Sequence, residues 1–122
     1  MSRGDRQRLE DILAAIDAIR THLTRGDLSD ALVFDAVRVR LIEIGEAVKS
    51  VSAALLAEES GLPWAQIAGM RARLAHRYFD TSHTILTATV EHDLPELEQA
   101  ARSLLNHVAE DRLATGPCRG NM

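Results

Sequence analysis

The densest group of chemically active side chains in this sequence lies between Gly69 and Asp80. This segment contains three arginines, one histidine and the only tyrosine of the chain, namely Arg71, Arg73, His76, Arg77 and Tyr78. The chain as a whole is acidic, with a formal net charge of −4 at pH 7, so a basic segment of this density is exceptional in it. Because arginine binds phosphate through several N–H donors, the segment predicts a ligand that carries phosphate.

Residues of these types can cleave RNA without a metal or a cofactor. RNA carries its own nucleophile, the 2′-hydroxyl, and one histidine can remove its proton while a second protonates the leaving oxygen. An arginine can hold the phosphate and stabilise the additional charge of the transition state. Arginine-rich and histidine-rich stretches also occur on solvated helix faces, so the residue types alone leave a purely structural role open.

The spacing of these residues raises the question of how they meet. Each residue of an α-helix turns by about 100°, so Arg71 and His76 lie about 140° apart, whereas Arg71 and Tyr78 nearly share a face. A site that uses Arg71 and His76 together requires either a loosened helix around His76 or a second copy of the chain. We therefore expect a symmetric dimer with the site at the interface between its two copies.

Metal chemistry is not expected in this chain. The other four histidines are His22, His83, His92 and His107. No two of them have the four-residue spacing, with a nearby carboxylate, that is typical of zinc ligands on a helix. We interpret them as surface or capping residues and predict no metal site.

The elements that must position the basic segment are all predicted to be helices, because apolar residues recur at spacings of three and four. Ser29 is predicted to cap the second helix and Asp93 the last, and Pro63 suits the first turn of the third. The expected helices are 5–22, 29–55, 63–77, a short one near 82–90, and one from 93 onward. Their short connections predict an all-α, antiparallel four-helix bundle with an extra short helix.

The second helix is apolar on more than one side, so it should be the central helix, with another helix or another subunit on its second face. Gly45 inside this helix costs about 1 kcal/mol relative to alanine, and its expected benefit is a close helix–helix approach. Glu43 and Glu46 lie one turn apart. Their expected role is to pair with arginines of the helix that carries Arg71 and Arg73, or to face water.

The composition predicts one soluble domain. The chain has 122 residues, of which 46% are hydrophobic and only 3% aromatic, and we expect a domain over 1–113 and a flexible tail over 114–122. Cys118 is the only cysteine, so an intrachain disulfide is impossible. No apolar run approaches the roughly 18–20 residues of a membrane span, and the first residues are charged, so a cytoplasmic location is expected.

Several short motifs in this sequence resemble those of one known family. The pattern Arg-x4-His-x-Tyr, formed by Arg71, His76 and Tyr78, resembles the signature of the HepT-like toxins, a branch of the HEPN superfamily. The flanking motifs also resemble that family; they are Arg-Leu-Ile-Glu-Ile-Gly-Glu-Ala (40–47), Pro-Trp-x-x-Ile-Ala-Gly-Met-Arg (63–71) and Asp-Leu-Pro-Glu-Leu (93–97). The resemblance covers roughly residues 8 to 112.

The resemblance implies the HEPN fold, a homodimer and a metal-independent endoribonuclease that acts as the toxin of a type VII toxin–antitoxin system. Arg71 and His76 would be catalytic, and Arg73, Arg77 and Tyr78 would contact the phosphates of the RNA, either tRNA or mRNA. The implied partner is a minimal nucleotidyltransferase antitoxin that transfers AMP from ATP to the motif tyrosine, here Tyr78. AMP adds bulk and negative charge beside a phosphate-binding cleft, so it would repel RNA.

One residue departs from the family pattern. Family members often carry asparagine or another polar residue directly after the motif arginine, and this chain carries Ala72 there. The alternative reading is therefore a non-catalytic HEPN module that binds nucleotide or RNA, or that docks its partner nucleotidyltransferase. A third hypothesis is a plain helical interaction protein with a solvated basic face.

Overall fold

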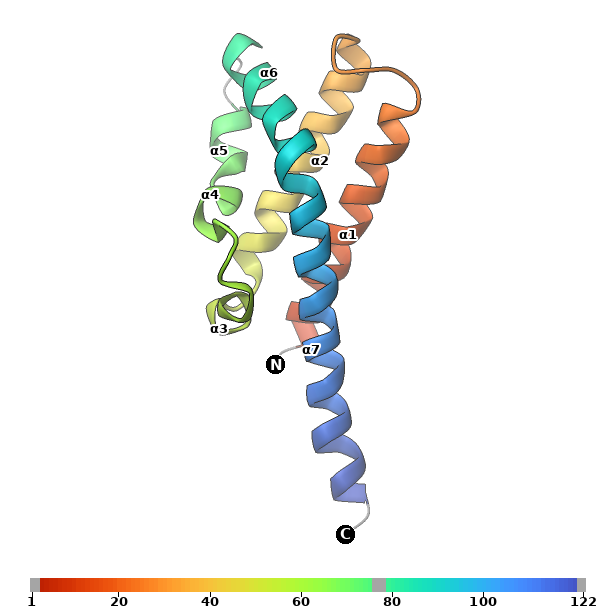
Figure 1. The fold of residues 1–122 in the computed structure, drawn as a ribbon, viewed down its shortest axis with the longest axis vertical. Helices are drawn as coiled ribbons and strands as arrows, with labels where there is room; N and C mark the ends of the chain where they lie inside the picture. The colour runs from red at the N-terminus through yellow and green to blue at the C-terminus, as the bar shows by residue number, and fades with distance from the viewer. Residues whose placement is uncertain (1–2, 76–78, 121–122) are drawn as a thin grey trace.

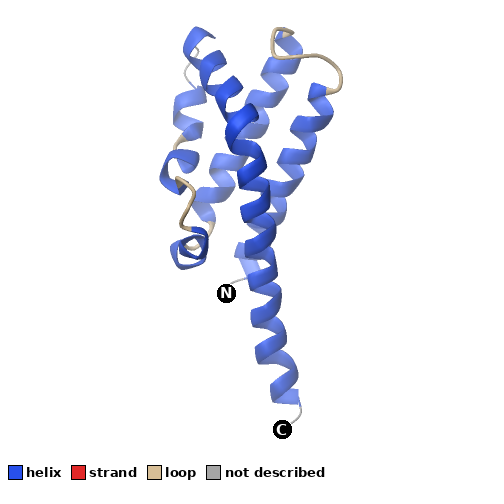
Figure 2. Ribbon diagram, in the orientation of Figure 1, coloured by secondary structure: helices blue, strands red, loops and turns tan. Residues whose placement is uncertain are grey.

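The structure, a computed structural model, describes residues 3–75 and 79–120, and these residues contain helices and no strand (Figure 2). The all-α fold predicted from the sequence is confirmed. The helical elements are α1 (Arg3–Leu23), α2 (Ala31–Ser50), α3 (Ala53–Leu56), the 3₁₀ turn η1 (Ala57–Glu59), α4 (Trp64–Ala68), α5 (Met70–Ala75), α6 (Phe79–Ala88), the π-turn η2 (Thr89–Asp93) and α7 (Leu94–Gly120).

Four helical arms form the bundle: α1, α2, the pair α4–α5, and the run α6–η2–α7 (Figure 1). α1 packs against α2 and α7, and α2 packs against α4 and α5 on its other side. The core is aliphatic, as the low aromatic content predicted. Its largest fully buried side chains are Leu9, Ile12, Ile16, Ile19, Val37, Leu41, Ile44, Val48, Leu55, Leu74, Leu86 and Leu104.

α2 is the central helix, as predicted, but neighbours within the chain cover both of its apolar sides. The width of the apolar surface of α2 is therefore explained by contacts within one chain, and it is no longer an argument for a dimer. Gly45 serves the predicted close approach, because a Cβ there would lie 3.1 Å from the carbonyl oxygen of Ile67. The same atom would lie 3.4 Å from the backbone nitrogen of Arg71, so α2 meets the α4–α5 arm backbone to backbone.

Both ends of α2 differ from the prediction. Asp30, and not Ser29, is the N-cap, because its carboxylate accepts the backbone N–H groups of Leu32 and Val33 at 2.8 and 3.3 Å. The helix ends at Ser50 and does not continue to Leu55. Just beyond it, Ser52 donates its backbone N–H and its hydroxyl to the buried carboxylate of Asp5 at 3.0 and 2.8 Å. These bonds to α1 hold the chain in a turn before α3.

The predicted helix start at Asp93 is wrong, because α6, η2 and α7 follow one another without a break. Asp93 lies inside the π-turn, where the backbone N–H of Leu94 donates to the carbonyl of Thr89, five residues earlier. Pro95 follows this turn directly. In a regular α-helix the ring of Pro95 would collide with the carbonyl four residues earlier, and the wider π-turn removes that collision.

α7 carries the helical backbone on to Gly120, past the domain boundary predicted at residue 113. Its last turns project beyond the ends of the other arms (Figure 1). The division into a domain and a flexible tail stays a prediction. In the described part of the chain, no helix combines the length and the apolar character that crossing a membrane requires.

Candidate functional site

Arg71 lies near the start of α5 and is held by α2. Its Nη1 atom contacts Oε1 of Glu46 at 2.8 Å, and its side chain is 61% exposed. The prediction that a glutamate of the second helix meets an arginine of the motif helix is confirmed for Glu46. Glu43 instead pairs with Arg40 on its own helix at 3.0 Å. Arg71 is therefore both oriented by a carboxylate and open to an incoming ligand.

Arg38 is a residue that the sequence analysis did not single out. Its Nη1 atom donates to the backbone carbonyl of Leu74 at 3.0 Å, near the carboxyl end of α5. A sequence signal for it existed, because Arg38 precedes Gly45 by seven residues and so lies on nearly the same face of α2. Gly45 marks the face that the α4–α5 arm approaches.

Arg73 points to a different place from Arg71. Its guanidinium donates to the backbone carbonyl of Gln66 at 2.8 Å, whereas Arg71 contacts α2. The side chains of residues two positions apart on a helix point in directions about 200° apart, which accounts for the divergence of Arg71 and Arg73. Arg73 lines a hollow of about 250 Å³ together with Thr84 and Asp93, between the α4–α5 arm and the run from α6 to α7. The structure therefore does not bring the two arginines together.

The other three predicted site residues, His76, Arg77 and Tyr78, lie outside the described residues. They connect α5, which ends at Ala75, to α6, which begins at Phe79. Near the start of α6, the ring of His83 stacks on Phe34 of α2 with centroids 5.5 Å apart. Within the described ranges, no group of three or more His, Cys, Asp or Glu residues is placed to hold a metal ion.

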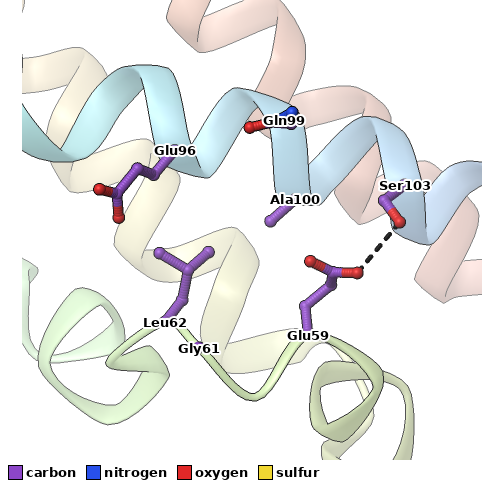
Figure 3. A pocket seen from close by; sticks show the side chains of 7 residues that line it. All are labelled: Glu59, Gly61, Leu62, Glu96, Gln99, Ala100 and Ser103. Atoms are coloured by element: carbon purple, nitrogen blue, oxygen red, sulfur yellow. Dashed lines mark hydrogen bonds between the residues drawn. The ribbon is translucent and has the colours of Figure 1, made fainter.

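A second hollow, of about 380 Å³, lies between the loop after η1 and the start of α7 (Figure 3). Two carboxylates, those of Glu59 and Glu96, line it, and Glu59 accepts a hydrogen bond from Ser103 at 3.0 Å. Its described lining contains no basic side chain. Carboxylates repel phosphate, so this hollow does not suit an RNA backbone.

A third hollow, of about 630 Å³, follows the groove between α1 and α2. Its lining includes alanines of α1 and the two arginines Arg8 and Arg40. Glu46, the partner of Arg71, also lines this groove, so the groove borders the ion pair of the motif arginine. The same groove is lined by three carboxylates, those of Asp11, Glu43 and Glu46, so its lining is mixed in charge and not basic. The hollow at Arg73 carries one arginine and one carboxylate, that of Asp93.

Comparison with known proteins matches residues 9–104 to the family model "Ribonuclease HepT-like". A protein of Caldanaerobacter subterraneus that is named as a candidate RNase is 41% identical over 68 residues, which are 55% of this chain and 61% of that protein. A protein of Thermococcus cleftensis named "Probable ribonuclease HepT" is 32% identical over 102 residues, which are 80% of this chain and 93% of that protein. No solved structure matches.

Proposed function

Because this chain belongs to the HepT-like ribonuclease family of the HEPN superfamily, we propose that it is a metal-independent endoribonuclease, the toxin of a type VII toxin–antitoxin pair. The observation that carries the proposal is the placement of Arg71. This arginine is exposed at the start of α5, is held by Glu46, and lies inside the region that the family model matches.

In the proposed reaction, Arg71 binds the scissile phosphate and stabilises the charge that develops on it. An incoming phosphate can draw the guanidinium from Glu46 without a large movement, since the ion pair is half exposed. His76 of one copy removes the proton of the 2′-hydroxyl, whose oxygen attacks the scissile phosphorus to form a 2′,3′-cyclic phosphate. The bond to the 5′-oxygen breaks, and His76 of the second copy protonates that leaving oxygen. Arg73, Arg77 and Tyr78 are proposed contacts to the RNA phosphates, and the divergence of Arg73 from Arg71 supports a contact to a phosphate further along the strand for Arg73.

A homodimer is part of the proposal, because one reaction needs both an acid and a base and two copies supply two His76 side chains. α2 retains two exposed large apolar side chains, Leu32 (82% exposed) and Val39 (45% exposed). They are seven residues apart and so lie on one face of the helix. Exposed apolar side chains on one helix face favour an interface with a second copy.

The first prediction concerns metal independence. The purified chain is expected to cleave total RNA or tRNA equally well in EDTA and in Mg²⁺, because the proposed chemistry uses only side chains and the 2′-hydroxyl. The measurement is the rate of fragment formation on a denaturing gel, with a DNA oligonucleotide of the same sequence as a control. Cleavage that stops in EDTA, or that also occurs on DNA, would contradict the proposed mechanism.

The second prediction concerns the antitoxin. We propose that a nucleotidyltransferase partner transfers AMP to Tyr78, which would place a phosphate and a nucleoside beside Arg71 and exclude RNA. Incubation with that partner and ATP is expected to raise the intact mass by one or more AMP units and to stop cleavage. Tyr78→Phe is expected to gain no mass, and its cleavage, although slowed by the loss of one proposed phosphate contact, should not change when the partner and ATP are added. A mass gain on this variant would show that another residue accepts AMP.

A non-catalytic RNA-binding or nucleotidyltransferase-docking module is the alternative, and Ala72 is the observation that favours it. Ala72 is exposed on α5 directly beside Arg71, and it offers no polar group to orient the site. RNA binding without cleavage by the unmodified, folded dimer would select this alternative.

A further inference from the structure

Two polar side chains of α2 contact α5 near its two ends. Glu46 contacts Arg71 near the beginning of α5, and Arg38 donates to the carbonyl of Leu74 near its end. Gly45 lies in α2 next to Glu46 and allows α5 to come close. The bond from Arg38 joins residues that are 36 positions apart in the chain. It is therefore a tertiary tie and not a local contact of one helix.

The end of α5 needs such a tie. α5 has only six residues, and a helix this short is marginal without tertiary contacts. The last four carbonyls of a helix have no partner within it, and Leu74 is one of them. A guanidinium cation stabilises the negative end of a helix as well as the single carbonyl that it bonds.

We infer that Arg38 is a positioning residue of the motif: it fixes the carboxyl end of α5, the helix end that directly precedes His76 in the sequence. The inference rests on the proposed ribonuclease function. Arg38 is half-buried, and one of its terminal nitrogens is engaged by the Leu74 carbonyl. Arg71, in contrast, is 61% exposed and is the arginine open to substrate.

The variants that test this role are Arg38→Met, which keeps an unbranched stem without a donor, and Arg38→Lys, which keeps a cationic donor. Arg40→Met is the matched control, because Arg40 lies on the same helix and contacts Glu43 and His22, which belong to α2 and α1. A small misplacement of a catalytic group costs on the order of 100-fold in rate. We therefore expect Arg38→Met to lower kcat by about 10- to 100-fold with KM changed by less than about 3-fold.

Arg38→Lys is expected to recover part of the lost kcat, and Arg40→Met should keep the rate of the parent chain. A variant in which KM rises while kcat is unchanged would make Arg38 a substrate contact and would overturn the positioning role. A lysine variant as slow as the methionine variant would also overturn it, since the donated hydrogen bond would then not be the cause.

A readout that does not depend on activity separates this inference from the proposed function. Amide hydrogen exchange over a peptide covering 72–80 is expected to be faster in Arg38→Met, and unchanged in Arg40→Met, because the end of α5 loses its tie. Unchanged exchange in Arg38→Met would overturn the inference even if the protein cleaves RNA. If the parent chain cleaves no RNA, the proposed function fails, and the exchange rates alone decide whether Arg38 holds this helix end.

Discussion

Replacing His76 with alanine is expected to lower RNA cleavage by about 10²- to 10⁴-fold, the range that a general acid–base group typically contributes. Among the described residues, α4 and α5 carry no histidine, and His83, the described histidine nearest to His76 in sequence, stacks its ring on Phe34. The measurement is the initial cleavage rate in EDTA, beside a circular-dichroism spectrum that verifies the helical fold. Overexpression of the variant should also lose toxicity to the cell.

The matched control for His76→Ala is His107→Ala. His107 lies on α7 and contacts Glu58 at 3.5 Å, so its removal is expected to leave cleavage unchanged. If His76→Ala cleaves as fast as the parent chain, the general base is not His76, and the assignment of the motif is wrong. If both variants lose activity together, the loss reflects the fold and not the chemistry.

Gly45→Val is expected to destabilise the fold by about 3 kcal/mol, in the upper range for an overpacked contact. The new Cβ would lie 3.1 Å from the carbonyl oxygen of Ile67 and 3.4 Å from the backbone nitrogen of Arg71. Both are backbone atoms and cannot rotate away, so the whole α4–α5 arm must move from α2. The gain in helix propensity of valine over glycine is only about 0.3 kcal/mol and does not offset this cost.

Urea unfolding of Gly45→Val measures the loss, and Gly61→Ala is its control. A Cβ added at Gly61 meets nothing within 4 Å, so that variant should stay within about 0.5 kcal/mol of the parent. Because the displaced arm carries Arg71, Gly45→Val should also slow cleavage under conditions where the variant is still folded. Unchanged stability would mean that α2 and the α4–α5 arm tolerate a wider separation than their contact in this structure implies.

The helical fold could be predicted because apolar spacing records which faces are buried. The stripe in α1 and the breadth of α2 both follow from that rule, and Gly45 marked the close contact before the partner was known. The helix ends were harder. Whether Asp30 or Ser29 caps α2, and whether Ser52 stops it early, depends on competing hydrogen bonds, one of them to Asp5, 47 residues away.

The candidate site was only partly predictable. The pairing of a second-helix glutamate with a motif arginine followed from their charges, and Glu46 and Arg71 confirm it. The divergence of Arg71 and Arg73 was implicit in the helical angle, but the elements that receive each arginine were not. The catalytic and phosphate-contact roles of the five motif residues stay predictions. Arg38 was missed because its partner is a backbone carbonyl, so its only sequence signal was its position seven residues before Gly45.

The π-turn has a geometric consequence for the motif. Five of the buried residues of α7 follow one another at intervals of three and four, namely Leu94, Leu97, Ala101, Leu104 and Val108. A π-turn holds one residue more than a regular turn, and Leu86 in α6, eight residues before Leu94, is fully buried on the other side of it. The π-turn absorbs the additional residue and so resets the phase of the helix. Without it, all of α6 would be rotated about its axis by about 100°. One residue in η2 thus sets the rotation of α6 about its own axis, and α6 begins at Phe79, directly after the motif residues.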